Sequence, residues 1–83
     1  MRFELVTPEK LMLSIEATYV TVPGSEGEFG VLEGHMPLVS TLQPGRLSVE
    51  TPDGTQHFNV TEGFAEVTAN SVTVLTEKAE ATH

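Results

Sequence analysis

The segment from Val22 to Gly45, VPGSEGEFGVLEGHMPLVSTLQPG, contains residue types that could bind an anion, bind a metal or transfer a proton. Gly24, Gly27 and Gly30 recur at every third position, which resembles the glycine pattern of a phosphate-binding loop. A Walker loop, however, ends in Gly-Lys-Ser/Thr, and a dinucleotide loop has tighter glycine spacing and leads into a helix. Two glutamates also lie between these glycines and would repel a phosphate. We therefore interpret the glycines as turn residues between strands.

Acidic and histidine side chains in the same segment suggest a second kind of site. His35 lies two residues after Glu33, with Glu26 and Glu28 slightly earlier, and carboxylates beside an imidazole can bind a metal or transfer protons. The histidines, however, fall at positions 35, 57 and 83 without ligand spacing, and the loop lacks the alternating Asp and Asn of a calcium loop. We therefore expect no metal and no cofactor.

A hydrolytic site would need a serine, a histidine and an acid that the fold brings together. No nucleophile-elbow pattern surrounds Ser25, Ser40 or Ser48, so we expect no catalytic residue and no enzymatic activity. What remains is an exposed, acidic, glycine-rich loop followed by the apolar stretch MPLVSTL. This combination suits docking to another protein better than catalysis.

The composition excludes several classes of partner. Twelve Asp and Glu against four Lys and Arg give a formal net charge of −8, which repels a nucleic-acid backbone or an anionic lipid surface. Cysteine is absent, which excludes disulfides and fits a reducing compartment. No apolar run approaches the roughly 20 residues of a membrane span, so we expect no direct membrane insertion. Asn59-Val60-Thr61 matches the glycosylation pattern, but without an export signal we interpret the match as chance.

Alternation of apolar and polar residues predicts strands along most of the chain. The clearest runs span residues 3–6, 46–50, 57–60, 65–69 and 71–77. Turn signals separate the runs at the spacing of a sandwich or barrel. Asp53-Gly54 predicts a tight hairpin between a strand that ends near Thr51 and one that starts near Gln56. Because 83 residues allow only one core, we expect a single all-β domain over residues 1–83.

The inward positions of these runs predict the core. We expect these side chains to be buried: Leu47, Val49, Phe58, Val60, Val67, Val72 and Val74. Two segments are ambiguous. Residues 9–17, EKLMLSIEA, are the best helical candidate, although Pro8 and the β-branched residues that follow make a strand at least as well supported. Residues 78–83 are expected to form a polar tail that is too short for a stable helix of its own.

Four motifs, in order, carry a resemblance to a known family. They are Gly-Ser-Glu-Gly-Glu at 24–28, Gly-His-x-Pro-Leu at 34–38, Leu-x-Pro-Gly at 42–45 and Gly-Phe-x-Glu-Val-x-x-Asn-x-Val-Thr-Val-Leu at 63–75. From about Phe3 to Glu77 the chain resembles the N-terminal domain of the epsilon subunit of bacterial and chloroplast F-type ATP synthases, which corresponds to the mitochondrial delta subunit. Two positions depart from the family pattern: Glu33 stands where proline is frequent, and Glu62 stands where glycine is frequent.

The resemblance implies a flattened ten-stranded antiparallel β-sandwich at the foot of the central stalk. It further implies contact with the gamma subunit and with the membrane rotor ring, the c-ring, so that proton flow is coupled to ATP synthesis. Such a subunit is non-catalytic and lies peripherally at the cytoplasmic face of the bacterial inner membrane. Carried over by position, Glu26, Gly27 and Glu28 face the ring, and Glu28 is the best candidate to pair with a basic loop there.

The same carry-over assigns His35, Met36, Leu38 and Ser40 to the surface against gamma. In the family, two helices usually follow this domain and can inhibit ATP hydrolysis. These helices are missing from the 83 residues, so the resemblance implies a form that does not inhibit.

The residues alone indicate a small acidic β-sandwich that binds another protein. The alternative is a free-standing β-domain that binds a carbohydrate or small ligand, which needs an aromatic platform. One Tyr, four Phe and no Trp supply such a platform poorly. A small hydrolase is a weaker third interpretation.

Overall fold

The computed structural model describes residues 1–82, and within that range the chain forms ten β-strands. The strands are β1 (Arg2–Val6), β2 (Leu11–Glu16), β3 (Tyr19–Gly24), β4 (Gly27–Val31), β5 (Leu38–Leu42), β6 (Gly45–Thr51), β7 (Gly54–Val60), β8 (Gly63–Val67), β9 (Ser71–Thr76) and β10 (Ala79–Thr82). The expectation of an all-β fold with ten strands is therefore confirmed.

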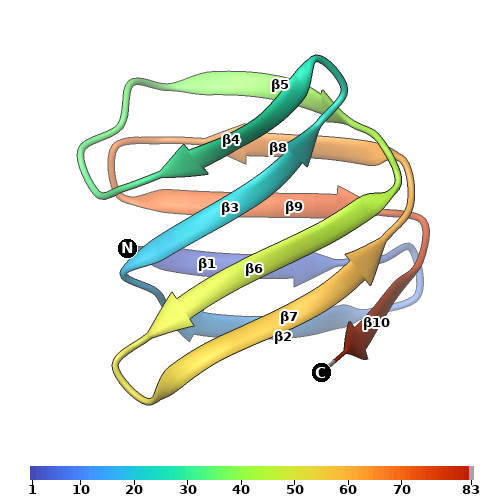
Figure 1. Cartoon of the computed structure of the whole chain (residues 1–83), viewed down its shortest axis with the longest axis horizontal. Helices are drawn as coiled ribbons and strands as arrows, with labels where there is room; N and C mark the ends of the chain where they lie inside the picture. Colours follow the sequence, from blue (N-terminus) through green and yellow to red (C-terminus); the bar gives the residue numbers. More distant parts are fainter. Residues whose placement is uncertain (83) are drawn as a thin grey trace.

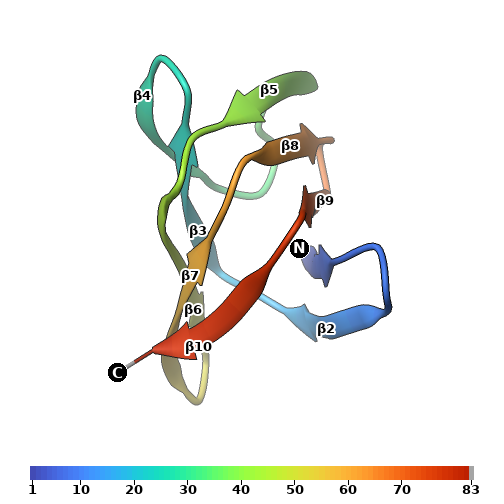
Figure 2. The ribbon, with the colours of Figure 1, turned by 90° about the vertical axis from the view of Figure 1, so that its right-hand side faces the viewer.

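The strands form one hydrogen-bonded sheet that folds over into two layers (Figures 1 and 2). Layer I contains β4, β3, β6, β7 and β10, and layer II contains β5, β8, β9, β1 and β2. The sheet turns its corner where β5 continues into β6, and there a single pair, Gly24 with Leu42, joins β3 to β5. The Gln43 N–H donates to Pro23 O at 3.1 Å and fixes this corner. The result is the expected flattened sandwich, with principal extents of 27 × 27 × 21 Å.

Of the nine strand pairings within residues 1–82, eight are antiparallel and one, β1 with β9, is parallel. The sequence analysis expected antiparallel pairing throughout. Alternation reveals which face of a strand is buried but not the direction of its neighbour, because the partner is chosen by contacts distant in sequence. The parallel pair places the first strand of the chain inside layer II, between β9 and β2.

The core lies between the two layers. All seven residues expected in the core are buried, including Val67 and Val72, which are paired across β8 and β9. The core also contains residues that the sequence analysis did not name, and the largest of these that are fully buried are Phe3, Leu5, Val20, Val22 and Val31. Burying each such side chain contributes roughly 1.5–3 kcal/mol, so this shared apolar layer dominates the stability of the domain.

The hairpin and the two ambiguous segments are resolved. β6 and β7 pair from Gly45 with Val60 to Thr51 with Gly54, which confirms the hairpin, although its turn is one residue earlier than Asp53-Gly54 implied. The helical candidate contains β2. Residues 79–82 are not a free tail, since they form β10 and pair with β7; His83 lies outside the described residues. Backbone hydrogen bonds to the open edge of β7 order this polar segment, which local propensity cannot reveal.

Replacing Val67 with aspartate is expected to unfold the domain. Val67 is 1% exposed, and an unpaired carboxylate there would cost several kcal/mol against a total stability of about 5–15 kcal/mol for a domain. The matched control is Val39→Asp, on the adjacent strand β5, because Val39 is 68% exposed and should tolerate the change within about 1 kcal/mol. Thermal unfolding followed by circular dichroism measures both, and a native-like cooperative transition in Val67→Asp would show that the core is assigned wrongly.

Candidate functional site

The acidic turn, residues 25–28, closes the β3–β4 hairpin. Ser25 and Glu26 form the two-residue turn, and Gly27 pairs with Gly24. Gly27 has φ +131°, a conformation that favours glycine. The side chains of Glu26 and Glu28 are exposed, and no salt bridge within residues 1–82 uses either carboxylate. The turn therefore presents two uncompensated negative charges to solvent.

The acidic turn is held rigidly against layer II. The Ser25 N–H donates to Thr41 O at 2.9 Å, and the hydroxyls of these two residues hydrogen-bond to each other. Because Thr41 belongs to β5, the turn is tied to the corner of the sheet and not only to its own hairpin. The backbone of the turn is thus fixed at one end of the molecule, where the β3–β4 connection lies at the top of Figure 1.

The β4–β5 loop, residues 32–37, lies at the opposite end of β4. The His35 N–H donates to Leu32 O at 3.1 Å and closes a tight turn, in which Gly34 has φ +88°. A turn with positive φ at its third residue is of the type II class, which also favours proline at the second position, here occupied by Glu33. The Gly34 N–H donates to Ala69 O at 2.6 Å, so the loop is anchored to the β8–β9 turn.

His35 and Met36 follow this turn. The Nδ1–H of His35 donates to Met36 O at 2.7 Å, which leaves Nε2 as the acceptor of the neutral ring. Met36 is 79% exposed, so its side chain is free to enter a partner. The loop therefore fixes its backbone while presenting a flexible apolar side chain, an arrangement typical of docking surfaces.

The four residues assigned to the gamma surface are divided by the fold. His35 and Met36 lie on the loop, whereas Leu38 and Ser40 belong to the half-buried side of β5, where Leu38 packs against the core. The outward positions of β5 are Val39 and Thr41. MPLVSTL is apolar at successive positions, so its sequence does not reveal which phase of the strand faces solvent.

Sequence reasoning missed an apolar row on the outer face of layer II. We define the apolar row as Phe64, Leu75, Val6 and Leu11, which are successive cross-strand partners on β8, β9, β1 and β2. Phe64 is 54% exposed, Leu75 46% and Leu11 53%. Leu75 lies between the buried residues Val74 and Thr76, and Phe64 precedes the buried Ala65. This was the available signal, because an apolar residue out of phase with the core must lie on the solvent-exposed face.

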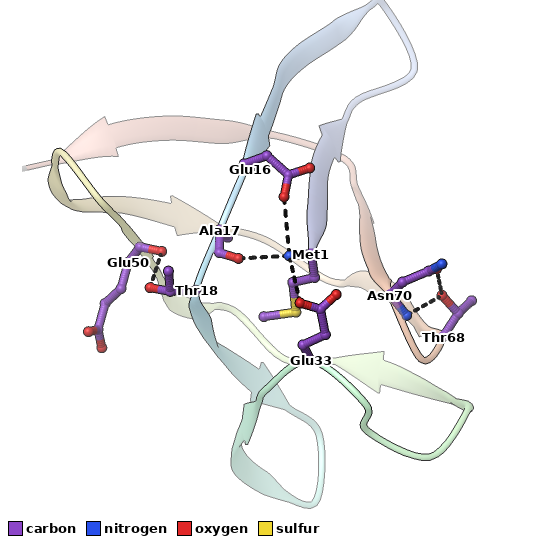
Figure 3. A network of polar contacts seen from close by, with 8 residues as sticks. All are labelled: Met1, Glu16, Ala17, Thr18, Glu33, Glu50, Thr68 and Asn70. Carbon is purple, nitrogen blue, oxygen red and sulfur yellow. Dashed lines mark hydrogen bonds and ion pairs between the residues drawn. The ribbon is translucent and has the colours of Figure 1, made fainter.

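A polar cluster joins the start of the chain to the end of β2 and to the β4–β5 loop (Figure 3). The amino group of Met1 donates to Ala17 O at 3.0 Å and to Glu16 Oε2 at 3.3 Å, and it lies 3.7 Å from Glu33 Oε1. Glu33, one of the two departures from the family pattern, therefore connects the β4–β5 loop to β1. The other, Glu62, is exposed just before β8.

A hydrogen-bonded serine–histidine pair within residues 1–82 bears on the small-hydrolase interpretation. Ser48 Oγ lies 2.8 Å from His57 Nδ1 on the outer face of layer I, but the strand neighbours of His57 are Ser48 and Thr82, and neither is a carboxylate. A Ser-His-acid triad requires a carboxylate that orients the histidine. Among residues 1–82 no three His, Cys, Asp or Glu side chains are grouped as metal ligands. The same part of the chain has no helix of the length and apolarity needed to cross a bilayer.

Comparison with known proteins identifies relatives over nearly the whole chain. Residues 1–82 match the family model described as ATP synthase, Delta/Epsilon chain, beta-sandwich domain. The ATP synthase epsilon chain of Cereibacter sphaeroides (strain ATCC 17025) is 48% identical over 81 residues, which are 98% of this chain and 61% of the relative. That of Nitratidesulfovibrio vulgaris (strain DP4) is 51% identical over 80 residues, covering 96% and 60%. The chain thus spans about three fifths of the length of these curated relatives.

Solved structures show the same fold. A chain in the cryo-EM structure of the Euglena gracilis mitochondrial ATP synthase, OSCP/F1/c-ring, aligns with a TM-score of 0.88 and 33% identity, covering 95% of this chain and 51% of that chain. A chain of the Tetrahymena thermophila mitochondrial ATP synthase central stalk/c-ring aligns with a TM-score of 0.80 and 18% identity, covering 96% and 65%.

The geometry of the β4–β5 loop makes a specific prediction for Gly34→Ala. Nothing lies within 4 Å of an added Cβ, so the cost is that of forcing an alanine to φ +88°, about 1 kcal/mol. Chemical denaturation should show this loss, whereas the neighbouring control Glu33→Ala should stay within about 0.5 kcal/mol. Equal stability of wild type and Gly34→Ala would contradict the turn geometry described here.

Proposed function

Because the chain belongs to the ATP synthase delta/epsilon chain β-sandwich domain family, we propose that it is a central-stalk domain that links the gamma subunit to the c-ring. Residues 1–83 act as one domain in this proposal, and they support the coupling of proton flow to ATP synthesis. The observation that carries the proposal is the family match over residues 1–82, on a fold that presents two separate candidate surfaces. The synthase complexes in which the two structural neighbours were solved include the c-ring, and this supports the assignment.

The acidic turn is the proposed contact with the c-ring. Glu26, Gly27 and Glu28 are exposed at one end of the molecule and are tied to the sheet corner through Ser25 and Thr41. An exposed carboxylate on a fixed backbone, such as that of Glu28, suits charge-assisted hydrogen bonds to a basic loop. Transmission of torque also requires a rigid contact, because a flexible contact would deform under load and would not transmit rotation.

The proposed gamma surface begins at His35 and Met36 and continues over the outer face of layer II. Met36 and Val39 are strongly exposed apolar side chains, and the apolar row lies on the same layer. Exposed apolar side chains of this number mark a protein interface more often than bare surface. Leu38 and Ser40 would support this surface from below, because their strand positions face inward.

The chain has a structural, non-catalytic role in this proposal. Catalysis resides elsewhere in the complex, and this domain supplies rigid docking surfaces at the cytoplasmic face of the bacterial inner membrane, held there by its partners. The excess of carboxylates fits this arrangement, because a direct approach to an anionic lipid surface would be repelled.

Glu28→Lys is expected to weaken attachment to the c-ring while leaving gamma binding and folding intact. The substitution replaces an attraction to a basic loop of the c-ring with a repulsion. Because salt screens this repulsion, the loss of c-ring binding should be greater at low ionic strength. Because Glu28 is exposed near the start of β4, the substitution should change the free energy of unfolding by only about 0.5 kcal/mol. Co-purification of c-ring and gamma with the tagged chain measures both contacts.

The reciprocal control is Met36→Asp. A charge at this exposed apolar position would be buried without a partner in a desolvated interface, so gamma binding should be lost. Any loss of c-ring binding should be a secondary effect of the lost gamma contact. If both variants assemble as well as wild type, or both lose the same partner, the two-surface proposal is wrong.

A further inference from the structure

The outer face of layer II has a pocket at one end of the apolar row. It has a volume of about 380 Å³, and its lining includes Val6, Phe64, Leu75, Glu62 and Glu77. Phe64 and Leu75 are paired across β8 and β9 and form its apolar part. The close approach of these strands is enforced at Gly63, where an added Cβ would lie 1.9 Å from Leu75 O. The apolar part of the pocket therefore lies on paired strands, whereas Thr7, Pro8, Glu62 and Glu77 line it from just beyond the strand ends.

Two carboxylates lie together at this pocket. Glu62 directly precedes β8 and Glu77 directly follows β9, and the Glu77 N–H approaches Glu62 O at 3.4 Å, so the two residues are neighbours. Both side chains are exposed, and no salt bridge within residues 1–82 includes either one. The pocket thus combines an apolar base with an unneutralised double negative charge.

Negative charge also borders the apolar row on its other side. Glu4 and Glu66 are both strand partners of Thr73, and these three residues lie two residues along their strands from Val6, Phe64 and Leu75, on the same face of the sheet. The cations nearest in sequence are Lys10, before Leu11, and Lys78, after Glu77. Acidic groups therefore flank the apolar row on both sides, which is complementary to an apolar segment that carries basic side chains.

We propose that this pocket receives an arginine or lysine side chain of the gamma subunit, whose neighbouring apolar residues lie along the apolar row. The inference rests on the proposed function, since it takes gamma as the partner of layer II. The aliphatic stem would pack on Phe64 and Leu75, and the cationic end would reach the carboxylates of Glu62 and Glu77. The face of Phe64 adds a cation–π contact for an arginine. A bare anion or a phosphate is repelled by the same carboxylates.

The first experiment measures binding of purified gamma to the full chain by calorimetry at low and high ionic strength. The double variant Glu62→Gln/Glu77→Gln removes both charges and keeps the shape. We expect it to bind gamma roughly tenfold more weakly at low ionic strength and to lose most of the salt dependence, because charge-assisted bonds are lost. The matched control is Asp53→Asn/Glu80→Gln, which removes two exposed charges from layer I and should bind like wild type.

The second experiment identifies the occupant. A photoreactive benzoylphenylalanine in place of Phe64, in the assembled complex, should crosslink to a gamma peptide that contains an arginine or lysine beside apolar residues. Crosslinking to a second copy of the chain, to the c-ring or to a segment beyond residue 83 of a longer chain would overturn the inference.

The binding measurements distinguish failure of the proposed function from failure of the pocket inference. If wild-type chain does not bind gamma at all, the proposed function fails and the inference fails with it. If wild type binds gamma but the Glu62→Gln/Glu77→Gln variant binds as tightly as wild type, the pocket inference is wrong and the stalk function stands.

Discussion

The sharing of one apolar layer by the two halves of a single folded sheet is the constraint on which the rest of the structure depends. Ten short strands from so small a chain each give one face to that layer, so every functional group must lie on an outer face, at an edge or in a turn. The corner between β5 and β6 makes the arrangement possible, because there the chain passes from layer II to layer I. Docking surfaces on a sandwich of this kind inherit the rigidity of its core.

The same corner also fixes the acidic turn relative to layer II, so that the turn can serve as a rigid docking surface. Pairing with β6 and the Gly24–Leu42 pair hold the body of β3, and the bonds from Ser25 to Thr41 add a direct tie between the turn itself and β5. Through these contacts, the backbone that carries Glu26 and Glu28 is fixed relative to layer II, which carries the proposed gamma surface. The two candidate contacts are therefore separate in space and joined by one stiff body, as a coupling element requires.

Much of the fold could be predicted from the alternation of apolar and polar residues. The features that could not be predicted depend on contacts between segments distant in sequence. Core residues such as Val67 and Val72 follow from period-two patterning, and the β6–β7 hairpin follows from its turn residues. The parallel pairing of β1 and the ordering of residues 79–82 as β10 depend on partners distant in sequence. The candidate site was partly predicted, since the acidic turn lies exposed as expected. Alternation can show that Leu75 faces solvent, but only cross-strand register brings the side chains of the apolar row together.

The most direct test of the central claim is reconstitution of ATP-driven proton transport. Membranes whose synthase has been depleted of its own epsilon subunit would receive the purified chain, and acidification of inverted vesicles would be followed with a fluorescent dye. The account predicts that the chain restores proton transport coupled to ATP hydrolysis, because it joins gamma to the c-ring. Hydrolysis that stays uncoupled after addition of a folded chain, with no gain in proton transport, would contradict it.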